Sequence, residues 1–208
     1  HRDTLNRRTT FSYNGTGDLT SVQDALSQRT TYSWSSGLLQ SVENARGHLT
    51  SFSYDGSRRL QTSQNALSEV VTYSYDSAGN VQTVTDELGR VTTFSYDAKH
   101  RLLTMVDALS GRTTYTYNVN GQVTSVADPL NRVTSLVYNA QGFNTSVTEA
   151  VGSGLDRTTT YTYLANGWVS TVENGLNQVT TYAYTVYGDV AAVTDSLGNR
   201  NTFTYDAA

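Results

Sequence analysis

The stretch that decides the fold is VVTYSYDSAGNVQTVTDELGRVTTFSY, residues 70–96. Its last part, from Arg90 to Tyr96, alternates, so Thr92, Phe94 and Tyr96 share one face of an extended chain and the residues between them share the other. β-branched and aromatic residues favour a pleated, half-buried surface. The run therefore predicts a β-strand with one aromatic face.

A turn and a second strand precede this run. In residues 76–80 the Asp76 side chain can bond its own backbone, and Gly79 can adopt a positive φ without a Cβ clash. Residues 81–85 read as a short strand, and residues 86–90 turn the chain again. Val81 and Val84 are three residues apart and cannot share a face of a regular strand, so we expect a bulge or an early strand end there. Glycine returns at the place of Gly79 as Gly17, Gly37, Gly121, Gly142, Gly167 and Gly188, with Arg58 and His100 as departures.

This hairpin is one copy of a repeat. The aromatic that ends its first strand recurs at spacings of 21, 20, 21, 21, 21, 21, 25, 21 and 21 residues, as Tyr13, Trp34, Tyr54, Tyr75, Tyr96, Tyr117, Tyr138, Tyr163, Tyr184 and Tyr205. We call these residues the anchors. A second aromatic lies two residues before each anchor, at Phe11, Tyr32, Phe52, Tyr73, Phe94, Tyr115, Tyr161, Tyr182 and Phe203, with Leu136 as the substitute. The chain thus holds about ten copies of one unit.

Both links of the unit are too short for the crossover that parallel strands need, so the sheet should be an antiparallel meander. Roughly twenty strands at about 4.8 Å apiece form a ribbon on the order of 95 Å long, and a twisted ribbon of that length must coil, close or stack. A leucine recurs in the second turn, and we expect it to plug the open end of each hairpin pair; it is found at Leu5, Leu26, Leu67, Leu88, Leu109, Leu130, Leu176 and Leu197.

Composition narrows the class of protein. The 208 residues are only 37% hydrophobic and contain no isoleucine but 15 tyrosines, which suits strands with a wet face better than a dry core. The net charge of −4 predicts no attraction to nucleic acid. There is no cysteine, and no apolar run approaches a membrane span.

The repeat unit has a recognisable pattern: aromatic-x-Tyr-Asp-x-x-Gly, then a strand with Val, then Asp-x-Leu-Gly-Arg. This pattern resembles the RHS/YD repeat. Residues 75–81 and 86–92 are the best copy, and the resemblance covers essentially the whole chain. The Asp after the anchor is replaced in some copies, at Asn14, Asn118, Asn139, Leu164 and Thr185. The resemblance implies a β-sheet that spirals into a hollow shell or tube, in bacterial secreted proteins, insecticidal toxin complexes and teneurins. In many such proteins the shell encloses a C-terminal toxin released by autoproteolysis.

No residue stands out as catalytic, metal-binding or cofactor-binding. His1, His48 and His100 lie at unrelated phases of the repeat. The repeated acids could supply calcium ligands or a glycosidase pair. A Ca²⁺ loop motif is absent, however, and residues that recur in about ten repeats usually serve the fold rather than one reaction. We interpret them as turn formers, at Asp55, Asp76, Asp97, Asp206, Asp86, Asp107, Asp128 and Asp195. Pro129 follows Asp128 in an ordinary inter-repeat turn.

A true site should break the repeat. The largest break is a four-residue insertion at 150–156, where Gly152, Ser153 and Gly154 form a possible contact loop, with a tolerated surface insertion as the more economical explanation. The extra aromatics Phe143, Trp168 and Tyr187 lie next to turns; they allow a sugar-stacking patch, but local packing explains them better.

Residues 1–208 are therefore predicted to be a single continuous all-β array, a window of a longer polypeptide or a chain that joins other copies end to end. Its leading function is non-enzymatic: part of the wall of a shell that encloses a toxin or cargo domain in a secreted or cell-surface bacterial protein. The alternative is an extracellular fibre, tubule or adhesin that contacts cell-surface proteins or glycans. Neighbouring repeats are the expected partners, without nucleic acid, cofactor or membrane span.

Overall fold

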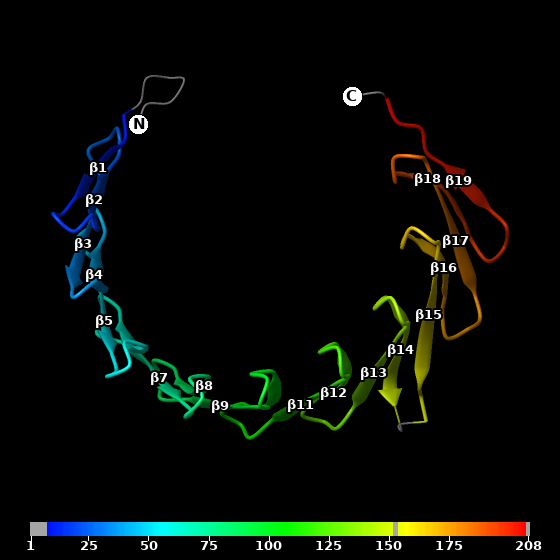
Figure 1. Cartoon of the computed structure of the whole chain (residues 1–208), viewed down its shortest axis with the longest axis horizontal. Coiled ribbons are helices and arrows are strands. Elements are labelled where there is room, and N and C mark those ends of the chain that lie inside the picture. The colour runs from blue at the N-terminus through cyan, green and yellow to red at the C-terminus, as the bar shows by residue number, and fades with distance from the viewer. Residues whose placement is uncertain (1–7, 152–153, 207–208) are drawn as a thin grey trace. The chain divides into compact units, whose positions relative to one another are not determined.

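The computed structural model describes residues 8–151 and 154–206. This part of the chain contains 19 β-strands and no helix, as the repeat predicted. No helix in it is therefore long and apolar enough to cross a membrane. The chain divides into two compact units, residues 1–95 and 96–208, and within each the strands follow one another in chain order (Figure 1).

The first unit is an antiparallel meander in which every strand pairs with the next in sequence. Its strands are β1 (Thr10–Tyr13), β2 (Leu19–Gln23), β3 (Arg29–Ser35), β4 (Leu38–Glu43), β5 (Leu49–Tyr54), β6 (Leu60–Gln64), β7 (Val70–Tyr75), β8 (Val81–Thr85) and β9 (Val91–Tyr96), the last of which reaches the boundary.

The second unit has the same construction, again with antiparallel pairs between consecutive strands. Its strands are β10 (Leu102–Val106), β11 (Arg112–Tyr117), β12 (Val123–Ala127), β13 (Val133–Tyr138), β14 (Asn144–Val151), β15 (Arg157–Tyr163), β16 (Val169–Glu173), β17 (Val179–Tyr184), β18 (Val190–Thr194) and β19 (Arg200–Thr202).

The predicted irregularity in the second strand of the hairpin is a β-bulge. Tyr75 pairs with Val81, whereas the residue before Tyr75 pairs with Thr83, so Gln82 has no partner across the hairpin. The bulge lets Val81 and Val84 both lie opposite aromatic residues, although they are three apart. The same shift occurs in seven further hairpins of the described chain.

The two turns of the repeat share one hydrogen-bond pattern. In the first turn the Asp76 N–H donates to the carbonyl of Asn80 at 2.9 Å, and the Gly79 N–H donates to the carbonyl of Asp76 at 3.1 Å. The second turn repeats this from Asp86, whose N–H donates to the carbonyl of Arg90 at 3.0 Å. Such a turn places its fourth residue in the left-handed region.

Six of the predicted glycines lie at that fourth position and have a positive φ between 86° and 99°: Gly17, Gly79, Gly121, Gly142, Gly167 and Gly188. Gly37 also has a positive φ, 71°, but it lies in a shorter turn, between Ser35 and Leu38, which pair with each other. The two departures keep the same backbone, with φ 64° at Arg58 and 62° at His100. Second turns often hold serine or asparagine there instead, as at Ser110 (φ 66°). Because a Cβ is disfavoured in this region, these turns retain local strain.

Replacing Ser110 by glycine is expected to raise the free energy of unfolding by about 0.5–1 kcal/mol, since glycine relieves the left-handed strain at a cost in unfolded-chain entropy. The urea midpoint of the variant measures the change. Ser77→Gly is the matched control, because Ser77 is not among the positive-φ residues, and it should lower the midpoint. Equal losses for both variants would show that the turn at Ser110 is not strained.

The sheet has no dry core. Among the described residues, only Ser21 and Ala192 are almost fully buried, at 3% and 2% exposure, and both occupy the third position of a second strand. The aromatic columns are mostly half-buried. Stability must therefore come from contacts between neighbouring hairpins, as in other repeat arrays.

The expectation that the second-turn leucines plug the hairpin ends is wrong. They are between 72% and 93% exposed, at Leu26, Leu67, Leu88, Leu109, Leu130, Leu176 and Leu197, while Leu5 lies outside the described residues. The physical reason is the turn itself: the N–H of each leucine is bonded to the first Asp or Asn side chain of the turn, as at Leu88 (3.0 Å to Asp86 Oδ1). The main chain is thereby held inside the turn, and the leucine projects from the rim of the sheet.

Candidate functional site

Eight of the ten anchors use their polar tip to join two hairpins. The Tyr75 hydroxyl donates to the carbonyl of Leu60 at 2.7 Å, and Leu60 is the residue that pairs with the preceding anchor, Tyr54. The same bond is made at Trp34 to Leu19, Tyr54 to Leu39, Tyr117 to Leu102, Tyr138 to Val123, Tyr163 to Asn144, Tyr184 to Val169 and Tyr205 to Val190. Tyr13, in the first strand, is 61% exposed. The anchors are thus inter-repeat links, a role that their spacing alone did not reveal.

The residue after the first-turn glycine position can cover the ring of the next anchor. The guanidinium of Arg59 lies 4.4 Å from the centre of the Tyr75 ring, and that of Arg101 lies 4.6 Å from the Tyr117 ring. These are cation–π distances. A side chain of one repeat therefore shields the anchor of the following one.

Two extra aromatics occupy this covering position. Phe143 stacks on Tyr163 with ring centres 4.9 Å apart, and Trp168 lies 5.1 Å from Tyr184. Burial raises the pKa of the Tyr163 hydroxyl above its ordinary value. Local packing thus accounts for Phe143 and Trp168, whereas Tyr187 is 89% exposed.

Seven of the eight repeated acids form turns, as expected, whereas Asp206 lies in a stretch without a turn. Asp76 Oδ1 accepts the N–H groups of Ala78 and Asn80, both at 2.9 Å. The Asn80 amide, which donates to Asp76 Oδ2 at 2.8 Å, is the main cause that holds the pKa of the Asp76 carboxyl below its ordinary value. Asn118 makes the same two backbone bonds through its Oδ1, at 3.0 Å each, so the turn needs a side-chain acceptor and not a charge.

Asp76→Ala is therefore expected to lower the urea midpoint clearly, while Asp76→Asn keeps most of the stability at neutral pH. Because the folded-state pKa is depressed, the stabilisation by the Asp76 carboxylate is present above its unfolded pKa of about 3.9 and is lost as the pH falls through the folded pKa. Urea midpoints recorded from pH 5 downward should thus fall less steeply for Asp76→Asn than for the wild type. Parallel profiles would contradict this assignment.

The candidate ligands do not converge. His48 and His100 are exposed in separate turns of different units, and His1 lies outside the described residues. In residues 8–151 and 154–206 no group of three or more His, Asp or Glu side chains is placed to hold a metal ion. The carboxylates of the turn-forming acids accept N–H groups of their own turns.

The insertion leaves the sheet at the rim that carries the second turns. It extends β14 to Val151, and β15 starts at Arg157. Gly152 and Ser153 of the possible contact loop lie outside the described residues; Gly154 is exposed, with φ 74° and open space where a Cβ would be. The role of this loop stays a prediction.

The face opposite the aromatic columns carries bonded pairs of hydroxyls, which the sequence analysis did not single out. Partners across a hairpin are hydroxyl residues, and their side-chain oxygens lie 2.6 Å apart at Ser74 and Thr83. Equivalent pairs are Ser33 with Ser41, Ser53 with Thr62, Thr116 with Ser125 and Thr162 with Thr171. This face is polar and uncharged at these positions, and it offers hydrogen bonds rather than an ionised nucleophile.

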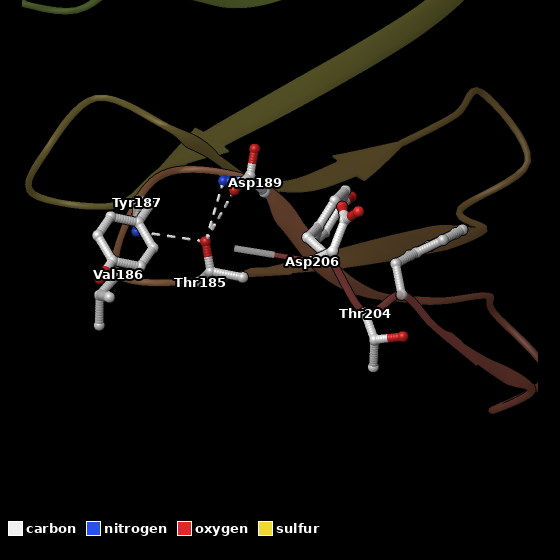
Figure 2. A pocket seen from close by; sticks show the side chains of 8 residues that line it. Thr185, Val186, Tyr187, Asp189, Thr204 and Asp206 are labelled. Carbon is white, nitrogen blue, oxygen red and sulfur yellow. Dashed lines mark hydrogen bonds between the residues drawn. The ribbon is translucent and has the colours of Figure 1, made fainter. Parts of the chain in front are cut away.

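A cavity of about 730 Å³ lies in the second unit between the turn at residues 185–189 and residues 203–206 (Figure 2). Thr185 replaces the usual Asp and its Oγ1 accepts the N–H groups of Tyr187 and Asp189, both at 3.2 Å. Asp189 occupies the position from which Arg59 covers its anchor, and Tyr205 is 53% exposed. The cavity thus lies beside the anchor Tyr205, where the small side chain of Asp189 takes the place of the arginine or aromatic ring that covers the anchor in other repeats.

Comparison with known proteins agrees with this construction. The RHS repeat model matches residues 75–113, 97–133 and 117–154, and no curated protein matches the chain. The Tc holotoxin pore of Photorhabdus luminescens with a TccC3 variant is 14% identical, with a TM-score of 0.65 over 90% of this chain and 14% of that chain. A TcdB2–TccC3–TEV structure is 16% identical, with a TM-score of 0.51 over 97% of this chain and 15% of that chain.

These structural likenesses concern the fold, and the chain spans about one seventh of the length of the proteins it resembles. The matched residues contain anchors, bulges and Asp turns, and the same features continue on both sides of them. Residues 75–154 of the chain therefore match the RHS repeat.

Proposed function

We propose that this chain is part of the wall of an RHS-repeat shell that encloses a toxin or cargo domain. The observation that carries the proposal is the series of hairpins in which eight anchors bond the hairpin before them, in a fold that superposes on 90% of its length with a Tc toxin assembly. Such a series supplies a continuous surface without any chemistry of its own. Containment is a role that a surface can perform by shape.

The proposed role is non-enzymatic. The distinctive side chains of the repeat have structural partners: the anchors bond backbone carbonyls, and the turn acids bond N–H groups. The hydroxyl pairs bond one another. A catalytic group would need an unengaged nucleophile beside a base, held in place by its neighbours. The match of residues 75–154 to the RHS repeat supports the same proposal.

The proposal also places the protein outside the bacterial cell, on its surface or in a secreted toxin, with the toxin domain as the partner. The support is the kind of assembly in which the similar fold occurs, a Tc holotoxin pore and a TcdB2–TccC3 complex. A glycan or cell-surface protein as partner belongs to the alternative, in which the repeats continue as a fibre, tubule or adhesin.

Imaging of the full-length gene product separates these functions. Negative-stain electron microscopy should show closed particles of uniform size with density inside, and limited proteolysis should spare the enclosed domain until the particles are opened by denaturant. Tubes of indefinite length, or a cargo domain cut as fast as an isolated one, would contradict the shell. Binding of the intact particles to glycans would favour the adhesin.

A further inference from the structure

The cavity beside the anchor Tyr205 combines aromatic rings with acids. Its volume of about 730 Å³ lies within the range of small-ligand sites, roughly 300–1,000 Å³. Figure 2 shows Tyr187 and Asp189 on the turn that forms one wall and Asp206 on the segment that forms the other. None of the eight described residues that line the cavity is basic. The cavity therefore favours a cation with a flat, partly apolar body.

Other repeats show which group occupies the equivalent place. The residue after the fourth turn position covers the ring of the next anchor, and in two repeats this residue is an arginine. The Arg101 guanidinium lies 4.6 Å from the centre of the Tyr117 ring. It also donates to Asp97 Oδ2 at 2.7 Å and to the carbonyl of Asn118 at 3.2 Å. An aromatic ring, a carboxylate and a carbonyl thus hold the guanidinium together.

The cavity has these acceptors but lacks the cation. The Tyr205 ring is 53% exposed, and Asp206 follows it in the chain as Asn118 follows Tyr117. At the four anchors with an arginine or aromatic cover, the cover comes from the repeat before the anchor. Asp189 has that position relative to Tyr205, so the repeat places a carboxylate where it elsewhere places a guanidinium.

The Asp189 carboxylate is weakly bonded by its own turn. Asp18 has the same position in the first repeat, and its Oδ2 accepts the Asn14 amide at 3.0 Å and the Thr16 hydroxyl at 2.7 Å. In the turn of Asp189 the first residue is Thr185, which has no amide, and its hydroxyl lies 3.5 Å from Asp189 Oδ2. This distance is at the long limit of a hydrogen bond. The Asp189 carboxylate can therefore accept a charged donor from outside the turn.

We propose that the cavity binds an arginine side chain of a partner protein, whose guanidinium lies on the Tyr205 ring and pairs with the Asp189 and Asp206 carboxylates. The partner then supplies to Tyr205 the cation that Arg101 supplies to Tyr117 within the chain. Arginine suits this site better than lysine, because its planar guanidinium stacks on aromatic faces and bonds a carboxylate through two N–H groups. The inference concerns binding alone and holds whether or not the shell function is correct.

Titration of the ¹⁵N-labelled whole chain with N-acetylarginine amide, followed by NMR, tests the site. The amide signals of Tyr187, Asp189, Tyr205 and Asp206 should shift together, with a Kd in the millimolar range. Binding should weaken as the salt concentration rises, because the carboxylates are exposed. N-acetylcitrulline amide has the same shape without the charge and should bind about threefold more weakly or less.

Three variants assign the binding to Asp189. Asp189→Asn keeps a residue that another repeat uses at this position, Asn80, and should weaken binding of the arginine amide about threefold. Asp189→Arg should abolish it, because the new side chain covers the ring itself. Glu87→Gln is the matched control: it makes the same change in charge as Asp189→Asn, at an exposed turn of the first unit, and should bind like the wild type.

Equal binding of the arginine and citrulline amides by the wild type would overturn the proposal, and this comparison needs no variant to fold. Unchanged binding in Asp189→Arg, with a urea midpoint at least equal to that of the wild type, would do so as well. Tighter binding of N-acetyltrimethyllysine amide than of the arginine amide would also contradict it, by identifying a quaternary ammonium group as the ligand.

Discussion

Replacing Tyr117 by alanine is expected to lower the free energy of unfolding by about 3 kcal/mol, as for other large aromatic truncations. The half-buried ring lies under the Arg101 guanidinium, and its hydroxyl donates to the carbonyl of Leu102 at 2.7 Å. The variant loses packing, the cation–π contact and the link between two hairpins together. Urea unfolding followed by tyrosine fluorescence and by far-ultraviolet circular dichroism measures the loss.

Two controls divide this effect into parts. Tyr117→Phe keeps the ring and removes only the hydroxyl, so it should cost about 1 kcal/mol. Tyr187→Ala removes a tyrosine that is 89% exposed and should cost less than about 0.5 kcal/mol. A loss for Tyr117→Ala no larger than that for Tyr187→Ala would mean that the aromatic columns do not hold the hairpins together.

Asn144→Val should raise the free energy of unfolding by about 1–3 kcal/mol, because it removes an unsatisfied polar group from an apolar position. Asn144 pairs with the anchor Tyr138, and both polar atoms of its side chain are buried without a hydrogen-bond partner. Leucine or valine fills this position in the other described hairpins whose pairing places it beside an anchor: Leu19, Leu39, Leu60, Val81, Val123, Val169 and Val190. The Asn144 carbonyl, which accepts the Tyr163 hydroxyl, is unchanged by the substitution.

The reverse substitution, Val123→Asn, is the matched control, since Val123 occupies the same position beside Tyr117. It should destabilise the protein by a similar amount. If Asn144→Val instead lowered the urea midpoint, the Asn144 side chain would have to make a favourable contact with a group outside the chain, and this hairpin would become the first place to look for a ligand.

Much of the fold could be predicted because the same pattern of strand and turn residues recurs in each repeat. Alternation fixed the aromatic face, the short links fixed antiparallel pairing, and the spacing of Val81 and Val84 predicted the bulge that the pairing confirms. Glycine at the fourth turn position predicted the positive φ, and the structure adds that Arg58 and His100 adopt it as well. These are properties of one or two adjacent strands, which local sequence can specify.

The remaining features depend on which side chains meet across two hairpins. The bond from Tyr75 to Leu60 joins residues fifteen positions apart, and the cover of Arg59 over Tyr75 joins neighbouring repeats. Periodicity predicts on which face of the sheet a side chain lies, but not which group of the neighbouring hairpin the end of that side chain contacts. The second-turn leucines differ from the prediction for the same reason: apolar character alone predicts that they face inward, whereas the hydrogen bonds of the turn direct them away from the sheet.

The link from each anchor to the hairpin before it also sets how such a protein can change in length. Most hairpins bond the hairpin before them through an aromatic donor and a backbone carbonyl, so a gene can gain or lose whole 21-residue blocks by unequal recombination while the new junction keeps the same kind of bond. A deletion of half a block would instead join two first strands and leave an anchor without its acceptor. Whole-repeat steps are therefore the natural increments in which a wall of this kind can be enlarged to fit a different content.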